Sequence, residues 1–353
     1  MPKIKTPQEQ KDIIFENLLF LAPLAGYTDL PFRKVVKRFG VDITVSEMIS
    51  SHALAFSSAK TLKMLAKSPN ETPFSVQIAG SKPEVLSKAI EVLNKQNEIN
   101  KNHIDILDFN CGCPAPKVAN HGNGSGLLKN LDLLVKCLNL IRERTNARYT
   151  SVKVRLGFDK KIPIEIANAL NDANVDFVVV HARTKADAYK KERIDYQALE
   201  NMKQILRHPL IANGEIDSPQ KAQEVLDFTG ANGVMIGRAA LKSPWIFWQI
   251  KQSKRSDELP NVIKREIVLE HFDAMIDFYG ERGAIMFRKN LHAYAKGEEG
   301  ASAFRNVANN ISEPKSMREA IEEFFGDSRI KGGFSSLCRA KQKKRIKCVK
   351  CVK

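Results

Sequence analysis

The chain has 353 residues, of which 43% are hydrophobic and 27% are charged. This composition is ordinary for a folded protein with one large domain and a small one, and it excludes a collagen, a coiled coil and a disordered chain. The formal net charge is +16, unevenly spread: residues 331–353 carry +9, residues 255–330 carry −3 and residues 1–254 carry +10, which fits a polyanionic partner or a merely solvated surface.

Short β-branched or apolar runs alternate with segments of helical periodicity along residues 1–254. The eight runs are Leu18–Ala25, Val41–Glu47, Pro73–Ala79, Ile104–Asn110, Ser151–Leu156, Asp176–His181, Pro209–Ala212 and Gly233–Ile236. The helical segments include Pro31–Phe39, Pro83–Leu93, Leu131–Arg144, Ile162–Ala173 and Pro219–Phe228. Eight such repeats predict an α/β protein with a (β/α)8 TIM barrel. A doubly wound sheet is the alternative, but it more often has six strands and an early Gly-rich turn.

The pattern changes after residue 254, where no further strand-like run occurs. Amphipathic helices are predicted at Ile263–Tyr279, Glu281–Ala295, Ala301–Asn310 and Met317–Phe325. We therefore expect a C-terminal all-helical domain at 255–328 and a basic, disordered tail at 329–353. The tail cysteines Cys338, Cys348 and Cys351 have no fourth ligand beside them, so no metal site is predicted.

Polar residues stand where the predicted strands end, which is where a TIM barrel carries its functional groups. The first strand ends in the small-residue turn that holds Pro23, Leu24 and Ala25, and the third ends with Gln77. Further strands lead to Asn110-Cys111-Gly112-Cys113, to Lys153 and Arg155 on one side of a strand, and to His181 followed by Arg183.

The last two strands lead into the loops Asn213-Gly214-Glu215 and Gly237-Arg238. Glycine amides and one arginine at these loops are typical of a phosphate cradle. Each polar residue alone has an ordinary structural explanation, but six strand ends in order predict a flat phosphorylated cofactor across the barrel mouth. Lys153 would favour negative charge on that cofactor. The segment Gly122–Gly126 is predicted to be a flexible loop over the site, with a plain turn as the alternative.

Ordered motifs resemble those of the tRNA-dihydrouridine synthases, and of their bacterial B-type branch most. The motifs are APLAGYTDLPFR at 22–33, SVQIAG at 75–80, DFNCGCPAPKVANHGNGSGLL at 108–128, VKVRLG at 152–157, VVHARTKADAY at 179–189, IANGEI at 211–216, VMIGRAALKSPWIF at 234–247 and MFRKNLHAYAKG at 286–297. The resemblance covers roughly residues 15–328 and implies an FMN-binding barrel at 1–254 followed by a tRNA-binding helical domain.

The resemblance also implies which residues act. FMN would contact Pro23, Leu24, Ala25, Gln77, Lys153, His181, Asn213, Gly214, Glu215, Gly237 and Arg238. The family usually has Asp where this chain has Glu215. NADPH would reduce FMN, and hydride would then pass from flavin N5 to C6 of a uridine flipped out of the tRNA. Cys113 would donate the proton to C5, whereas Cys111 is expected to be a small buried hydrophobic residue.

The resemblance implies tRNA contacts as well, for which we choose Arg183, Arg288, Lys289 and Arg305. Two other functions stay open: an FMN barrel that reduces a small molecule, and a non-catalytic RNA-binding or RNA-folding protein. The helical domain and the basic charge disfavour the first of these. The presence of Lys153, His181 and Cys113 disfavours the second.

The predicted surroundings of the protein are those of a cytoplasmic enzyme. No stretch approaches the ~18 apolar residues of a membrane span, and the charged N-terminus has no apolar signal-peptide core. Six cysteines in a chain of this length do not make a secreted disulfide framework. We therefore expect a monomer in the cytoplasm, with no membrane contact and no obligate protein partner.

Overall fold

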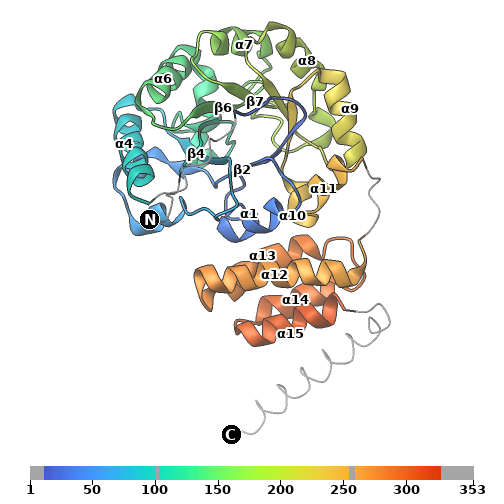
Figure 1. Ribbon diagram of the computed structural model, residues 1–353. Helices are drawn as coiled ribbons and strands as arrows, with labels where there is room; N and C mark the ends of the chain where they lie inside the picture. Colours follow the sequence, from blue (N-terminus) through green and yellow to red (C-terminus); the bar gives the residue numbers. More distant parts are fainter. Residues whose placement is uncertain (1–11, 101–102, 254–258, 327–353) are drawn as a thin grey trace, which may run out of the picture.

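Figure 1 shows the computed structural model, which describes residues 12–100, 103–253 and 259–326; the tail predicted at 329–353 lies outside them. The strands are β1 Leu18–Leu21, β2 Ile43–Val45, β3 Ile49–Ser50, β4 Phe74–Ala79, β5 Ile106–Cys111, β6 Tyr149–Arg155, β7 Phe177–His181, β8 Leu210–Asn213 and β9 Gly233–Ile236. The barrel helices are α1 Leu30–Lys37, α2 Ser51–Ala55, α3 Ala59–Lys63, α4 Pro83–Asn100, α5 Pro116–Ala119, α6 Leu131–Arg144, α7 Pro163–Asn171, α8 Tyr196–Ile205, α9 Pro219–Thr229, α10 Arg238–Lys242 and α11 Ile246–Lys251, with 3-10 helices η1 Gly124–Lys129 and η2 Lys191–Arg193. The C-terminal helices are α12 Asn261–Tyr279, α13 Arg282–Tyr294, α14 Ala301–Asn310 and α15 Pro314–Phe324.

The strands form one closed parallel barrel, in the order β2-β1-β9-β8-β7-β6-β5-β4. A direct pairing of β2 with β4, at Thr44 opposite Phe74, closes the ring. The two-residue strand β3 extends the β4 side, where Ile49 lies opposite Ile78. Each of the eight predicted runs overlaps one barrel strand, so the predicted (β/α)8 barrel is confirmed. The short strand β3 was not predicted.

Local sequence accounts for these elements. β7 reads FVVVH and is buried along its whole length, as expected for a β-branched strand covered on both faces. α9 begins after Ser218, whose side chain accepts a hydrogen bond from the Lys221 N–H at 3.1 Å, and Pro219 takes the first helical position. The helix ends at Gly230 in the left-handed conformation at φ +63°.

The barrel is a packed body and not a pore, because apolar side chains fill its interior. The buried members of this interior cluster are Phe20, Ala22, Ile43, Val45, Ile106, Phe177, Val179, Ile211 and Met235. A larger apolar cluster lies between the strands and the surrounding helices. The polar strand ends are therefore confined to the mouth above the filled interior.

The helices α12–α15 form a separate bundle with its own apolar core, as predicted. Phe304 stacks on Phe324, with ring centroids 4.0 Å apart and planes at 6°. The bundle lies against α1 and α10 (Figure 1). Several contacts join it to the barrel. Among them, the Tyr279 hydroxyl donates to Asp29 at 3.1 Å, Lys63 Nζ donates to the Phe278 carbonyl at 2.7 Å, and Arg38 pairs with Glu270. No helix among the described residues has the length and apolar character to span a bilayer.

A buried ion pair supports the first barrel repeat. Arg33 of α1 is 1% exposed and donates from Nε to Glu71 Oε1 at 2.6 Å. The same carboxylate oxygen accepts from the Thr44 hydroxyl at 2.6 Å. Because both charges are removed from water, each depends on the other for compensation.

We expect Glu71→Ala to lower the free energy of unfolding by about 3–5 kcal/mol, because it leaves the Arg33 guanidinium buried without a counter-charge. Urea denaturation measures the loss. Glu224→Ala is the matched control, since its pair with Lys221 is exposed and an exposed pair contributes at most about 1 kcal/mol. Equal effects of the two substitutions would contradict the prediction.

Candidate active site

The strand register brings predicted polar residues to one rim of the barrel. Asn110 of β5 lies opposite Lys153 of β6, and His181 of β7 lies opposite Asn213 of β8. Arg155, two residues beyond Lys153, lies opposite His181. Because parallel strands all end on the same face of a barrel, the ends of these strands line one mouth.

Lys153 places a positive charge at this mouth that its acidic neighbours only partly balance. Burial lowers the pKa of its ammonium group from 10.5 to about 8. Arg155 lowers it further, while Asp108 and Cys113 oppose the shift. Lys153 is therefore still mainly protonated at neutral pH, and an anionic group beside it would be stabilised.

The imidazole of His181 stays neutral near pH 7. Burial lowers its pKa well below 6.5, and the cations Arg155, Lys153, Arg183 and Arg238 lower it further. Arg183 Nη1 lies 3.4 Å from His181 Nε2, and this ring nitrogen must accept because a guanidinium only donates. The ring proton is therefore on Nδ1.

The turn after β8 places a glycine, Gly214, at the mouth, where no side chain shields the backbone. Asn213 Nδ2 donates to the Met235 carbonyl at 2.7 Å and so ties this turn to β9. Gly214 has φ +125°, a conformation that side chains disfavour. A Cβ atom there would lie 2.6 Å from Ile194 Cδ1 and 2.9 Å from His181 Cδ2. Only glycine fits this position without displacement of its neighbours.

The turn after β9 supplies the second half of the cradle. Gly237 directly precedes α10, which begins at Arg238. The Arg238 side chain is 54% exposed, so its guanidinium can reach a ligand. Two glycine turns and an accessible arginine fit a phosphate group by their donor chemistry.

Glu215 and Arg183 occupy places that differ from those expected. The Glu215 carboxylate accepts from Arg183 Nη2 at 2.7 Å and also pairs with Arg238, so it orients these arginines and is itself already occupied. Arg183 has no exposed side-chain surface, and its Nε donates to the Lys190 carbonyl at 2.8 Å. The Arg183 side chain is therefore buried and paired in this structure, and its contact with RNA stays a prediction.

The turn after β1 lies beside the phosphate cradle. Pro23 and Leu24 are half-buried and Ala25 is exposed, so a ligand can reach this turn. A Cβ atom on Gly237 would lie 3.5 Å from Ala22 Cβ and 3.9 Å from Leu24 Cδ2. The parallel pairing of β1 with β9 thus places the two predicted cofactor segments in contact range.

The sequence analysis placed Gln77 at the end of a strand. In the structure it lies within β4 instead, where it has no exposed surface. Its Nε2 donates to Asp108 at 2.6 Å, and its Oε1 accepts from Asn110 at 2.7 Å. Asp108 was not predicted as a site residue. The available signal was a carboxylate in the middle of the predicted strand Ile104–Asn110, directly after Ile106 and Leu107.

Cys113 follows β5 in a tightly held turn. Its side chain is half-buried, its N–H donates to Asn110 Oδ1 at 2.9 Å, and its carbonyl accepts from the Ser125 hydroxyl at 2.8 Å. Cys111 is fully buried, and burial raises the pKa of its thiol well above 9, which agrees with a packing role. The expected flexible loop at Gly122–Gly126 instead runs into the helix η1, and Gly124 and Ser125 are buried against Cys113.

The predicted RNA-binding residues of the helical domain differ in their surroundings. Lys289 Nζ lies 5.2 Å from the centroid of the Tyr27 ring and 3.2 Å from the position of a Cβ atom on Gly26, so it reaches the barrel mouth. Arg288 donates to the Ile311 carbonyl from both Nε and Nη2, and Arg305 Nε donates to the Ala301 carbonyl. Arg288 and Arg305 are both half-buried.

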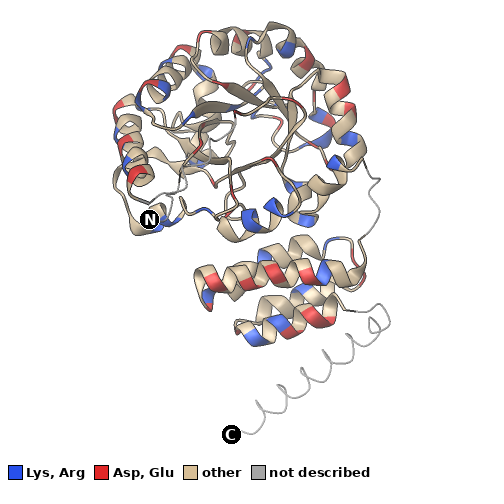
Figure 2. Ribbon diagram, viewed as in Figure 1, with Lys and Arg blue, Asp and Glu red and all other residues tan. Residues whose placement is uncertain are grey.

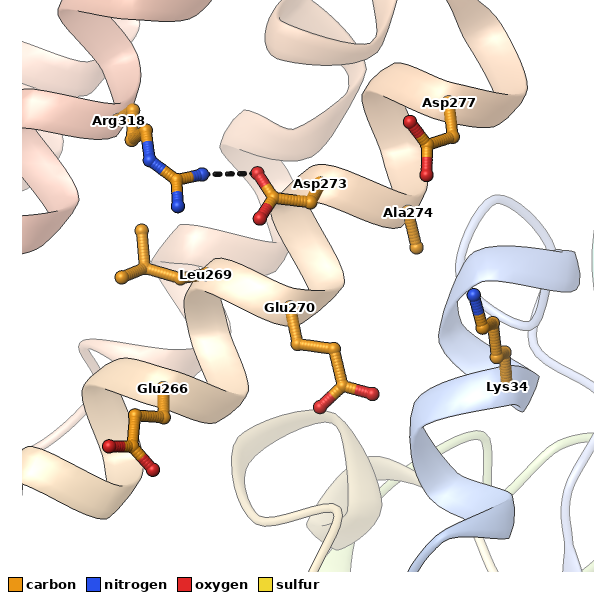
Figure 3. Close-up of a pocket in the computed structure, with 8 residues that line it drawn as sticks. All are labelled: Lys34, Glu266, Leu269, Glu270, Asp273, Ala274, Asp277 and Arg318. Carbon is orange, nitrogen blue, oxygen red and sulfur yellow. Dashed lines mark hydrogen bonds and ion pairs between the residues drawn. The ribbon is translucent and has the colours of Figure 1, made fainter.

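A groove between α1, α12 and α15 is unsuitable for an anion. Figure 3 shows Glu266, Glu270, Asp273 and Asp277 along α12, with Arg318 pointing to Asp273. Figure 2 shows both signs of charge on the helical domain. We call these four carboxylates the acidic stripe. Asp273 is paired with Arg318 and Glu270 with Arg38, and the remaining negative charge disfavours a phosphate on this side of the bundle. No group of three or more His, Cys, Asp or Glu side chains in the described part of the chain could hold a metal ion.

A family model and two curated proteins match most of the chain, and all three name the same family. The family model described as Dihydrouridine synthase (Dus) matches residues 20–328. A probable tRNA-dihydrouridine synthase of Helicobacter pylori is 64% identical over 312 residues, which is 88% of this chain and 93% of that protein. tRNA-dihydrouridine synthase B of Vibrio vulnificus is 38% identical over 317 residues, which is 88% of this chain and 96% of that protein.

Solved structures share the fold at low sequence identity. Morphinone reductase in complex with tetrahydroNAD has a TM-score of 0.50 at 13% identity, with 73% of this chain and 93% of that chain covered. A 2-naphthoyl-CoA reductase complex has a TM-score of 0.53 at 12% identity, with 67% and 50% covered. At such identities the likeness concerns the barrel alone.

The cradle geometry predicts a steric effect on phosphate binding. If this turn holds the phosphate of the flavin that the family resemblance implies, Gly214→Ala should weaken flavin binding roughly tenfold, or about 1.4 kcal/mol, because the methyl group would displace His181 and Ile194. Quenching of flavin fluorescence measures the affinity. Gly280→Ala is the control, because Gly280 also has positive φ but no atom within 4 Å of its added Cβ. Equal affinities of the two variants would show that the β8 turn does not hold the phosphate.

Proposed function

This chain belongs to the dihydrouridine synthase family, and from that membership we propose that it reduces the C5=C6 bond of specific uridines in tRNA to 5,6-dihydrouridine. We further propose FMN as the bound cofactor and NADPH as its reductant. Cytoplasmic location and a monomeric state stay predictions.

The position of Cys113 carries the proposal. Its thiol lies close enough to Lys153 and Arg155 to affect the pKa of each side chain. A half-buried thiol at the mouth of a cationic barrel is in a suitable place to deliver a proton beside a site that stabilises negative charge. Cys113 would hold that proton on Sγ and pass it to uracil C5.

The residues around the mouth fit FMN in two groups. Gly214, Gly237 and Arg238 would bind the phosphate, with Asn213 and Glu215 holding these turns and arginines in place. The turn Pro23–Ala25, Lys153 and His181 would surround the ring system. When bound, FMN would supply the hydride for uracil C6. Lys153 would stabilise negative charge on the ring system. Neutral His181 would donate a hydrogen bond to the flavin from Nδ1.

The target uridine must leave the base stack, because C5 and C6 are inaccessible inside it. The charge pattern favours one side for the tRNA. The acidic stripe of α12 disfavours contact there, whereas Lys289 extends from α13 to the barrel mouth. We propose that the tRNA lies across the mouth and the α13–α14 side, with Arg288 and Arg305 contributing there.

A map of dihydrouridine in tRNA tests the function. In cells that lack the gene, we expect loss of the modification at a defined set of positions, restored by the wild-type gene. Cys113→Ala should bind FMN but fail to restore the map, because the proton donor to C5 is missing. Cys137→Ala, which alters a buried thiol of α6, is the control and should restore it.

Restoration by Cys113→Ala would remove this residue from the mechanism. An unchanged map in the deletion strain, together with bound flavin in the purified protein, would favour reduction of a small molecule.

Binding of tRNA should weaken steeply with salt, because phosphate contacts release counterions. We expect Lys289→Ala to lower the slope of log affinity against log salt by about one phosphate contact, or roughly 0.7. Lys88→Ala removes an exposed charge of the outer helix α4 and should leave the slope unchanged. Filter binding of tRNA between low and moderate salt gives both slopes. Salt-independent binding would contradict the proposed partner.

A further inference from the structure

A chain of buried hydrogen bonds leads from a carboxylate inside the barrel to the Cys113 turn. Asp108 accepts from Gln77 Nε2 at 2.6 Å, and Gln77 Oε1 accepts from Asn110 Nδ2 at 2.7 Å. Asn110 Oδ1 then accepts from the backbone N–H of Cys113 at 2.9 Å and of Gly112 at 3.2 Å. Asp108, Gln77 and Asn110 are at most 6% exposed, so water does not compete for these bonds.

The charge of Asp108 gives this chain its direction. An ionised carboxylate can only accept, so Gln77 must turn its NH2 group toward Asp108 and its oxygen toward Asn110. Asn110 must then donate through its own NH2 group, which leaves its oxygen facing the Cys113 turn. That oxygen accepts the two N–H groups that shape the turn. The N–H groups of Gly112 and Cys113 require the same order from the other end, because they only donate. Asp108 supplies the acceptor that pairs the last NH2 group of the chain and so anchors it.

We propose that Asp108 is a positioning residue for the proton donor: through Gln77 and then Asn110, it holds the Cys113 turn in the orientation from which Sγ reaches the substrate. This inference rests on the proposed function for its catalytic meaning. The relay itself depends only on the hydrogen bonds described above.

The surroundings of Asp108 indicate a functional reason for keeping its charge. Burial raises the pKa of this carboxyl from 3.8 to about 6, although Ser151 and Gln77 donate to it and Lys153 of β6 attracts it. The other titratable neighbour is Cys111 on the same strand, whose thiol is disfavoured from ionising by Asp108. The folded state holds the proton of Asp108 more tightly than the unfolded chain does. The fold therefore loses stability as the pH rises from about 4 to about 6, and this loss persists at higher pH.

Three variants break the relay at different points. Asp108→Leu removes the anchor, Gln77→Leu removes the connection, and Asp108→Asn keeps the shape but lets the amide orient either way. We expect kcat on tRNA to fall at least tenfold in the two leucine variants and less in Asp108→Asn, with KM for tRNA unchanged. The double leucine variant should be no slower than Gln77→Leu, because the two residues act in series.

Ser151→Ala is the matched control. Its hydroxyl donates to the other oxygen of the same carboxylate at 2.6 Å, but it lies outside the path to Cys113. We expect wild-type kcat in this variant. A fall equal to that of Asp108→Leu would overturn the relay, since it would show that any disturbance of the buried carboxylate suffices.

A second readout does not depend on tRNA. Iodoacetamide labelling of Cys113, resolved by peptide mass spectrometry, should become several-fold faster in Asp108→Leu and Gln77→Leu, and stay unchanged in Ser151→Ala. Asp108→Leu leaves the Ser151 hydroxyl and the Gln77 NH2 group without an acceptor, so we expect a lower melting temperature at pH 8 but a folded protein at the assay temperature. Unaltered labelling, or partial unfolding at the assay temperature that matches the loss of kcat, would refute the positioning role. If the wild-type enzyme does not reduce tRNA, the proposed function fails while labelling still decides the relay.

Discussion

The pairing of β2 with β4 is the constraint on which the rest of the structure depends, because it closes the barrel. An open parallel sheet twists by roughly 20–25° from strand to strand, which would spread the strand ends over a wide arc. Closure instead brings the ends of all eight barrel strands around one mouth. The first and last strands of the barrel order thereby become neighbours, as the register of Thr44 opposite Phe74 shows.

Closure also concentrates positive charge, and that concentration has an energetic cost. Lys153, Arg155, Arg183 and Arg238 all lower the pKa of His181, so their fields overlap at one place. Glu215 compensates two of these arginines. Like charges gathered in a partly dry site destabilise the free protein, and burial of the apolar core offsets this cost. An anionic cofactor would relieve this repulsion.

The sequence predicted what depends on local periodicity and strand order. The eight strands and the four C-terminal helices followed from apolar spacing, and the strand-end rule placed Lys153 and His181 at one mouth. It could not predict side-chain partners, because these depend on register between separate strands. The pair of Arg183 with Glu215, for example, joins the turns after β7 and β8 and leaves no local signal in the sequence. Gln77 and Asp108 form their bond across β4 and β5, which no local pattern specifies.

The turn after β1 couples the two halves of the molecule. Asp29 caps α1 through the Phe32 N–H and accepts from Tyr279 of the helical domain, and burial raises its pKa to about 6. The same turn contains Gly26, whose N–H donates to Glu47 and whose surface faces Lys289. A segment that borders the cofactor cradle is thus also the contact of the proposed tRNA-binding domain. Any rotation of that domain must move or break these contacts, so the orientation of a bound tRNA and the shape of the mouth cannot vary independently.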